Sequence, residues 1–453
     1  MTYPEVKKYL YSFVNYENLY KYSYKNSFKL DRFKSFLKTI GNPQLKLKVI
    51  HVAGSKGKGS VCVFIANILR QAGFKVGLYT SPHLSDFRER IRILYKKSKI
   101  VQNEFEGMIS KNEICNLVKE IKPAIDKFNK NSKYDSLSFF EVYTALAFRY
   151  FRDQQVDFVV LETGLGGRLD ATNTCKSLAS IITPISLEHT SLLGKTLKDI
   201  AYEKASIIKK GNSKTNKNKI LALTAKQDKP VNKVIESKVK HNNSILFKEG
   251  SDFKFILRNK SHFDYKGIYY NVGNLSINLL GRHQIANASL AIASIEALRY
   301  HNINVSQEAI RNGLRNSNWP ARFEIIAKEP TLIIDGAQNS ASVKALGETL
   351  RENFPHRKVW VIFGIARDKE LKDTCRQVEN IAKDIILTKS SNPRASEPND
   401  LVQFFKKMPI MVADTLKTAL KMVKSIVNKK DLIVVTGSLY LCAEAKEIKN
   451  KLG

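Results

Sequence analysis

The sequence predicts an α/β protein of two domains, each built around a mostly parallel sheet. Short apolar runs alternate with segments of helical period, and the alternation restarts after a cluster of Gly, Asn and Pro at residues 311–322. The 453 residues, 43% of them hydrophobic and 26% charged, provide enough chain for two cores. The same composition excludes disorder throughout the chain and a collagen-like fibre.

The first series starts with an apolar run at residues 47–54, which predicts a strand. A glycine-rich turn, a helix at 60–73 and a second strand at 75–81 follow it. The alternation recurs as a helix at 139–151 and strands at 156–164 and 177–185. Strands separated by helices of this length predict a parallel sheet covered on both faces.

Residues 253–280 have a different pattern, with short alternating segments interrupted by Gly and Asn. This pattern predicts antiparallel hairpins appended to the sheet. The following Ala-rich stretch at 281–301 predicts a helix.

A second, smaller α/β domain is predicted beyond the Gly, Asn and Pro cluster. Five apolar runs at 331–335, 358–364, 384–390, 409–414 and 431–438 alternate with helices, the last of which is expected from about Leu441. We therefore expect one domain at residues 1–317 and another at 318–453.

The chain carries 75 Lys and Arg against 42 Asp and Glu, a formal charge of +33. Nucleic acid, an anionic membrane surface and anionic small substrates all respond to such a field. The lysines are spread along the chain and mixed with Asn, as at Gly211–Ile220, which favours a solvated basic surface. We expect no specific nucleic-acid partner, no membrane partner and a monomer.

The five cysteines are scattered and never spaced as CxxC, so reduced, mostly buried thiols are expected rather than disulfides or a zinc site. No run reaches the length of a membrane-spanning helix, and the first residues lack the layout of a signal peptide. We expect a soluble, cytosolic protein.

The segment His51–Ser60, HVAGSKGKGS, lies between a predicted strand and a predicted helix. Glycines let backbone N–H groups turn toward an anion, the helix N-terminus adds positive potential, and Lys58 supplies a full charge. The spacing departs from GxxxxGK[ST], because Gly54 is only three residues before Gly57 and Gly59 separates Lys58 from Ser60. A triphosphate cradle is predicted, and a glycine-rich turn without a ligand is the alternative.

This loop resembles the HVAGTNGKGS loop of folylpolyglutamate synthases and dihydrofolate synthases, members of the Mur ligase superfamily, with Ser55 and Lys56 in place of Thr and Asn. Further blocks resemble the family in the same order along nearly the whole chain: YTSPHL (79–84), FRERI (87–91), SFFE (138–141), LETGLGGRLDATN (161–173), LEHTSLLG (187–194), IAYEKASIIK (200–209), GRHQIANA (281–288), WPARFE (319–324), IDGAQN (334–339) and VTGSLYL (435–441). The resemblance implies a P-loop ATPase-like, pterin-binding Mur ligase central domain and a Rossmann-like glutamate ligase domain.

Enzymes of this family transfer the γ-phosphate of ATP to a carboxylate, and the amine of glutamate attacks the resulting acyl phosphate. The resemblance implies Ser81, Glu162 and His189 as magnesium ligands, and hard cations indeed prefer oxygen ligands. A turn serine, a capping glutamate and a satisfied histidine are their structural alternatives. Lys204 matches a lysine that is carbamylated in the family and would serve a second magnesium. An ordinary surface lysine is the alternative, because an ammonium group cannot ligate a metal.

The resemblance also places ATP on Gly57, Lys58, Gly59, Ser60, Asn287, Arg322 and Asp335. Lys58, Lys204, His189 and Gln338 are the expected catalytic residues. Gln338 stands where the family pattern DGAHN has His, and an amide can donate to a phosphate oxygen but cannot become charged.

A pterin site is implied at Ser138, Phe139, Phe140, Glu141, Leu169, Asp170 and Ala171. The two aromatic rings could stack on a flat ligand or could equally be core residues. The expected reaction joins L-glutamate to dihydropteroate or a reduced folate, with conversion of ATP to ADP and phosphate. Two alternatives are a Mur-type ligase with another acyl substrate and a nucleotide- or nucleic-acid-binding relative with weakened catalysis. The basic charge and Gln338 motivate the latter.

Overall fold

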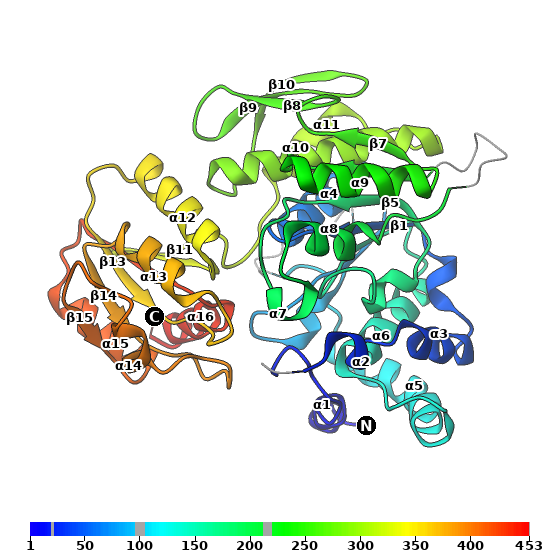
Figure 1. Cartoon of the computed structure of the whole chain (residues 1–453), viewed down its shortest axis with the longest axis horizontal. Helices are drawn as coiled ribbons and strands as arrows, with labels where there is room; N and C mark the ends of the chain where they lie inside the picture. Colours follow the sequence, from blue (N-terminus) through cyan, green and yellow to red (C-terminus); the bar gives the residue numbers. More distant parts are fainter. Residues whose placement is uncertain (20–21, 96–104, 212–219, 453) are drawn as a thin grey trace.

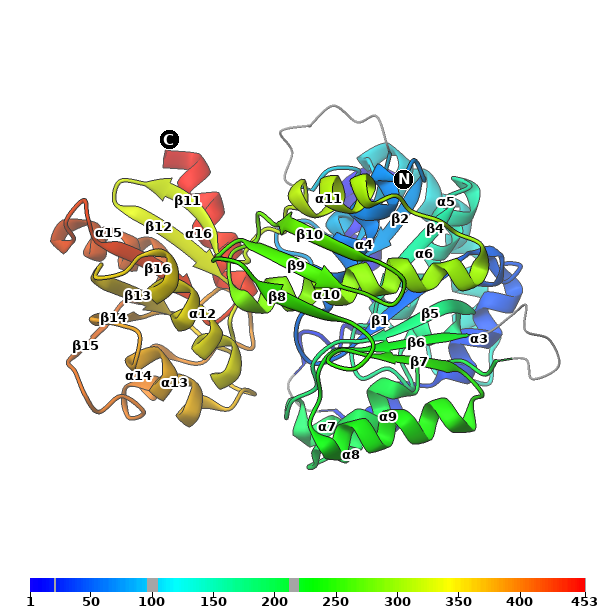
Figure 2. The same ribbon diagram turned by 90° about the horizontal axis from the view of Figure 1, so that it is seen from above.

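The computed structural model describes residues 1–19, 22–95, 105–211 and 220–452. Two α/β lobes lie side by side, and the C-terminal lobe runs from yellow to red in Figures 1 and 2. Of the lysine- and asparagine-rich stretch at Gly211–Ile220, residues 212–219 lie outside the described residues. No described helix is both long enough and apolar enough to cross a bilayer.

The N-terminal lobe is built on a seven-stranded sheet in the order β3-β2-β4-β1-β5-β6-β7, in which only β3 is antiparallel to its neighbour. Its strands are β1 Val49–Ala53, β2 Val76–Tyr79, β3 Ile91–Leu94, β4 Phe158–Glu162, β5 Ser177–Ile182, β6 Leu221–Thr224 and β7 Ile245–Lys248. Its helices are α1 Tyr3–Tyr11, α2 Tyr24–Ser27, α3 Leu30–Thr39, α4 Lys58–Gln71, α5 Lys111–Asn131, α6 Phe139–Asp153, α7 Thr190–Leu193, α8 Leu197–Ala205, α9 Lys229–His241, α10 Arg282–Ala297 and α11 Gln307–Arg315.

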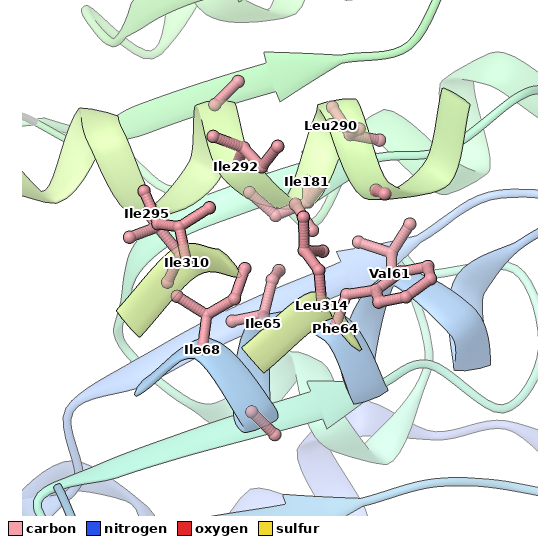
Figure 3. Close-up of a cluster of buried hydrophobic side chains, with 14 of the residues drawn as sticks. Val61, Phe64, Ile65, Ile68, Ile181, Leu290, Ile292, Ile295, Ile310 and Leu314 are labelled. Atoms are coloured by element: carbon pink, nitrogen blue, oxygen red, sulfur yellow. The ribbon is translucent and has the colours of Figure 1, made fainter. Parts of the chain in front are cut away.

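Successive strand residues enter cores on opposite faces of this sheet. Ile50 and Val52 of β1 pack with α4, α10 and α11, whereas Val49 packs with α1, α3, α5 and α6. Figure 3 shows the first of these cores, where side chains of α4 such as Phe64 and Ile68 meet Ile295 of α10 and Ile310 of α11. The parallel sheet covered on both faces is confirmed.

The predicted hairpins form a sheet of their own and do not extend the main one. Strands β8 Lys254–Leu257, β9 His262–Lys266 and β10 Asn271–Ser276 pair antiparallel in the order β10-β9-β8. Their inward residues Phe263, Tyr265 and Val272 join the core formed by α4 and α10. This sheet therefore covers α10.

The C-terminal lobe contains a six-stranded sheet in the order β11-β12-β16-β13-β14-β15, parallel except for β11. The five apolar runs correspond to β12 Thr331–Asp335, β13 Val359–Phe363, β14 Asp384–Leu387, β15 Ile410–Val412 and β16 Leu432–Thr436. Strand β11, Glu324–Lys328, was missed because it is a half-exposed edge strand without a continuous apolar run. The helices are α12 Ser340–Asn353, α13 Leu371–Glu379, α14 Pro398–Val402, α15 Leu416–Ile426 and α16 Leu439–Leu452.

Candidate functional site

The predicted phosphate loop connects β1 to α4, at the carboxyl end of a central strand. Gly57 precedes the helix with φ +80°, and a Cβ there would lie 2.4 Å from Oδ1 of Asn287. A Cβ on Gly54 would lie 1.9 Å from Oγ1 of Thr183. Both positions therefore require glycine, and the loop is held so that the N–H groups opening α4 remain available to an anion.

Two lysine side chains meet at the carbonyl oxygen of Gly54. Lys58 Nζ lies 3.1 Å and Lys204 Nζ 2.9 Å from that oxygen. Lys204 also donates to Oε1 of Glu188 at 2.8 Å, and Lys56 Nζ lies 4.0 Å from the other carboxylate oxygen. Glu188 therefore links lysines from the loop and from α8.

Charge in this cluster shifts several pKa values. Burial opposes ionisation of Glu188, but Lys204 and Lys58 hold the pKa of its carboxyl well below the usual range. Burial lowers the pKa of Lys56 to about 8, helped by the ammonium groups of Lys369 and Lys58 and opposed by Glu188. Burial lowers the pKa of Lys204 in the same way. The cluster holds more cations than one carboxylate can balance, which favours a polyanionic ligand.

Ser81, Glu162 and His189 lie around the same loop. The backbone N–H of Ser81 donates to Oε2 of Glu162 at 3.1 Å. Burial raises the pKa of Glu162, and Lys58 opposes that shift. His189, in the left-handed region at φ +49°, has a pKa lowered to about 3 by burial and by the charge of Lys369. Its ring is therefore neutral at physiological pH.

A hydroxyl, a carboxylate and a neutral imidazole are donors that fit a divalent cation that keeps some of its water ligands. In the part of the chain that the structure describes, no group of three or more His, Cys, Asp or Glu side chains forms a complete metal site. The set therefore fits a cation that is also held by a ligand such as a triphosphate, rather than by a closed protein cage.

The C-terminal lobe carries Arg322, Asp335 and Gln338, of which Arg322 and Gln338 line cavities shared with the first lobe. The Asp335 carboxylate accepts the backbone N–H groups of Phe323 at 2.8 Å and Ala337 at 2.9 Å. Burial raises its pKa, against the pull of Arg322. The charge of Arg322 also opposes the rise in the pKa of the Glu162 carboxyl, so the two lobes face each other at this point. Asp335 therefore holds the turn after β12, and it is not among the residues that line the cleft between the lobes.

A cleft of about 410 Å³ lies between the two lobes. Its lining includes the polar groups Ser81, Glu188, His189, Gln338 and Lys369. It also includes Phe140, Tyr440 and the rings of Tyr16, Tyr22 and Phe28, which contact one another. The cleft thus combines charged side chains with aromatic side chains suited to a flat ring.

The predicted pterin residues lie in three places. Phe140 and Asp170 line the cleft, while Ser138, Glu141, Leu169 and Ala171 border a separate small cavity on the other side of Phe140. Phe139 lies in the core, stacked on Tyr143 and Tyr11. Ser138 caps α6, and Glu141 forms a buried ion pair with Arg32 at 2.7 Å.

Sequence reasoning missed a set of contacts that joins the lobes. Arg394 Nη1 donates to the backbone oxygen of Glu17 at 2.6 Å, and its other nitrogens bind Asp368. The carboxylate of Glu17 in turn pairs with the fully buried Arg90. Neighbouring Lys369 enters the cleft. Of these residues, only Arg90 belongs to a quoted family block, FRERI (87–91). Glu188 and Lys56, in contrast, lie inside quoted family blocks. Glu188 is next to the predicted ligand His189, and Lys56 is a charged residue where the family loop has Asn, so both could have been proposed from the sequence.

The Mur ligase middle domain family matches residues 138–295, and the Mur ligase glutamate ligase domain family matches residues 321–439. The chain is 33% identical to the dihydrofolate synthase/folylpolyglutamate synthase of Bacillus subtilis, covering 92% of this chain and 94% of that protein. The folylpolyglutamate synthase of Mycobacterium tuberculosis complexed with ADP superposes with a TM-score of 0.88 at 28% identity, covering 99% of this chain and 98% of that one.

A solved FPGS–AMPPCP–folate complex superposes with a TM-score of 0.83 at 28% identity, over 100% of both chains. These similarities favour the ligase over the nucleic-acid-binding alternative and over a Mur-type enzyme with another acyl substrate. The resemblance predicted from the sequence blocks is thus confirmed: the chain belongs to the dihydrofolate synthase/folylpolyglutamate synthase family of Mur ligases.

Proposed function

We propose that this protein joins L-glutamate to dihydropteroate or a reduced folate, with conversion of ATP to ADP and phosphate. The observation that carries the proposal is the cleft between the lobes, where the loop lysine Lys58, Glu188 and His189 meet Lys369 and Gln338 beside an aromatic region. Relatives are named for these ligase activities, and similar structures were solved with ADP and with AMPPCP and folate.

In the first step, an oxygen of the substrate carboxylate attacks the γ-phosphorus of ATP, and the bond to ADP breaks. The α4 N-terminus with Gly57, Gly59 and Ser60 would hold the phosphates, and Lys58 would balance the charge that develops on the transferred group. Arg322 and Asp335 are proposed to hold the nucleotide from the C-terminal lobe, the arginine as a fork for phosphate oxygens, and Asn287 from α10 beside Gly57.

In the second step, the glutamate amine attacks the acyl carbon, the bond to phosphate breaks, and the proton that the amine loses as the amide forms is taken up by the released phosphate. Lys369 is proposed to hold the anionic groups of this intermediate and of glutamate, whereas Lys56, in the phosphate loop, is proposed to hold the phosphates of ATP. Gln338 can donate from its amide to a phosphate oxygen, but it carries no charge.

Ser81, Glu162 and His189 are proposed to hold magnesium, which would neutralise phosphate charge when bound. We further propose that Lys204 carries a carbamate and serves a second magnesium. Only a neutral amine reacts with carbon dioxide, and burial at 2% exposure lowers the Lys204 pKa in the direction that this reaction needs.

For the ring of the substrate, we propose contact with Phe140 and Asp170, which line the cleft. Leu169 and Ala171 would support Phe140 from behind. Ser138, Phe139 and Glu141 would hold the start of α6 in place. We assign residues 1–317 to the nucleotide- and pterin-binding domain and residues 318–453 to the glutamate ligase domain, because α11 ends at Arg315 and β11 begins at Glu324.

One coupled assay tests the proposal. Purified protein with ATP, magnesium and L-glutamate is given dihydropteroate or, separately, a reduced folate, and ADP release is recorded. We expect release that requires both glutamate and at least one pterin substrate. Absence of glutamate-dependent release with either substrate would refute the proposed function, and the relative rates would assign the two activities.

A further inference from the structure

Trp319 lies in the segment that links the two lobes, between α11 and β11, and its indole packs against the phosphate loop. A Cβ placed on Gly59 would lie 3.0 Å from Nε1 of the indole and 3.1 Å from Cζ2. The N–H edge of the ring therefore contacts the first turn of α4, where phosphates are proposed to bind. Gly59 permits this approach because it has no side chain.

The indole N–H is buried without an acceptor. Trp319 is only 9% exposed, and among the described residues its Nε1 has no hydrogen-bond partner. Buried polar groups are nearly always paired in folded proteins, so an orphaned donor at a binding cleft indicates an acceptor that arrives with a ligand. The other tryptophan, Trp360, is equally buried, but its N–H donates to Oδ2 of Asp431 at 3.3 Å.

A small cavity lies beside the indole ring. Trp319, Gly59, Ser81, Glu162 and Arg322 line this cavity of about 30 Å³, which matches a single oxygen-sized group. Its lining holds one cation, Arg322, and two carboxylates, Glu89 and Glu162, both of which accept backbone N–H groups. The indole N–H and the Arg322 guanidinium group are both donors, so an oxygen acceptor on a ligand suits this wall of the cavity.

We propose that the indole N–H of Trp319 donates a hydrogen bond to a phosphate oxygen of the bound nucleotide. This inference rests on the proposed function, because it takes ATP as the ligand of the loop. Trp319 is then a nucleotide-binding residue supplied by the linker itself, and nucleotide binding fixes the segment through which the two lobes are joined.

Two other acceptors are physically reasonable. An ordered water could occupy a cavity of this size. The face of Phe105 could also accept, since the two rings are edge-on with centroids 6.3 Å apart. In both cases the environment of the indole proton would not depend on the phosphates of a nucleotide.

The chain has only two tryptophans, so ¹⁵N-tryptophan labelling of the full protein gives two indole signals. A Trp360→Phe variant assigns them. On saturation with AMPPCP and magnesium we expect the Trp319 proton to shift strongly downfield while the Trp360 proton stays in place. Adenosine, with binding verified by competition against AMPPCP, should leave the Trp319 proton unshifted.

A Trp319 signal that AMPPCP leaves unchanged would overturn the inference, and a shift caused by adenosine alone would do so too, since the acceptor would then belong to the base or ribose. Calorimetry with AMPPCP separates this outcome from failure of the proposed function. Binding without an indole shift refutes only the role of Trp319, whereas no binding refutes the nucleotide site.

Kinetics give a second measurement. Trp319→Phe keeps an apolar ring and removes the donor, and should raise the KM for ATP about tenfold or more, as expected for a hydrogen bond to a charged group, with little change in the KM for the pterin substrate. Trp360→Phe is the matched control and should change neither. An unchanged KM for ATP in folded Trp319→Phe would contradict the proposal.

Discussion

The phosphate loop at Gly54–Ser60 and the start of α6 at Ser138–Glu141 both match family blocks, yet their polar groups are used differently. In the loop, Lys58 contacts only a backbone oxygen among the described residues, and the first N–H groups of α4 remain available. At α6, the Ser138 hydroxyl and the Glu141 carboxylate bind each other, and Glu141 also binds buried Arg32. Similarity to a family block therefore does not distinguish a residue that meets the ligand from one that holds the site together, but the hydrogen-bond partners do.

Lys58→Ala should have the largest effect on catalysis. Loss of the charge that stabilises the transferred phosphoryl group should reduce turnover by about 10²-fold or more, while the melting temperature stays near that of the wild type. ADP release and thermal unfolding are the measurements. The exposed Lys46→Ala is the control, and near-normal turnover of Lys58→Ala would refute the assignment of the loop.

Glu141→Gln should instead lower the free energy of unfolding. Arg32 would be left as an uncompensated buried charge, which costs about 3 kcal/mol of unfolding free energy, and the KM for the pterin substrate should stay within about twofold if Glu141 is structural. Denaturant unfolding and steady-state kinetics measure the two quantities. Glu120→Gln, which breaks an exposed pair with Arg149, should cost less than about 1 kcal/mol.

The protonation of Lys56 tests whether the phosphate loop binds ATP through its positive charge. Because its pKa is about 8, the side chain is protonated below pH 8 and becomes neutral above it. The KM for ATP should therefore rise as the pH passes 8, and Lys56→Asn should raise it about tenfold at pH 7, as expected for a lost charged contact. Lys56→Arg keeps its charge and should remove the pH-dependent rise; an identical rise in that variant would assign the titration to another group.

Ser138→Ala should have the smallest effect, a loss of about 1 kcal/mol as for other N-cap residues. Ser110 caps α5 with the same arrangement and a Glu at the third position, so Ser110→Ala is a close control. Both variants should lose similar stability without a change in the KM for the pterin substrate. A raised KM in Ser138→Ala alone would mean that this hydroxyl contacts the substrate.

Much of the fold could be predicted from the sequence because the buried parallel strands are continuous apolar runs. Strands β1, β4, β12 and β16 are examples. Four strands were missed. Strands β3 and β11 pair antiparallel at an edge of their sheets, and β6 and β7 are parallel strands of only four residues each, too short to stand out as apolar runs. The hairpins were recognised, but periodicity carries no information on which sheet a strand joins, and they form one of their own.

The candidate site shows the same limit. Lys58 and His189 are in local motifs, so they could be proposed from the sequence. The contact of Arg394 with Glu17 joins residues 377 positions apart and uses a backbone oxygen, which leaves no trace in the pattern of residues. Lys369 likewise enters the cleft only because the two lobes pack face to face.

The central claim is that the cleft activates a carboxylate by transferring phosphate to it. Substrate labelled with ¹⁸O in its carboxylate groups tests this directly, by mass spectrometry of the phosphate released in the presence of ATP, magnesium and L-glutamate. Formation of an acyl phosphate predicts one ¹⁸O atom in each phosphate released with amide formation. Unlabelled phosphate would show that ATP is hydrolysed without activating the carboxylate, and would contradict the account.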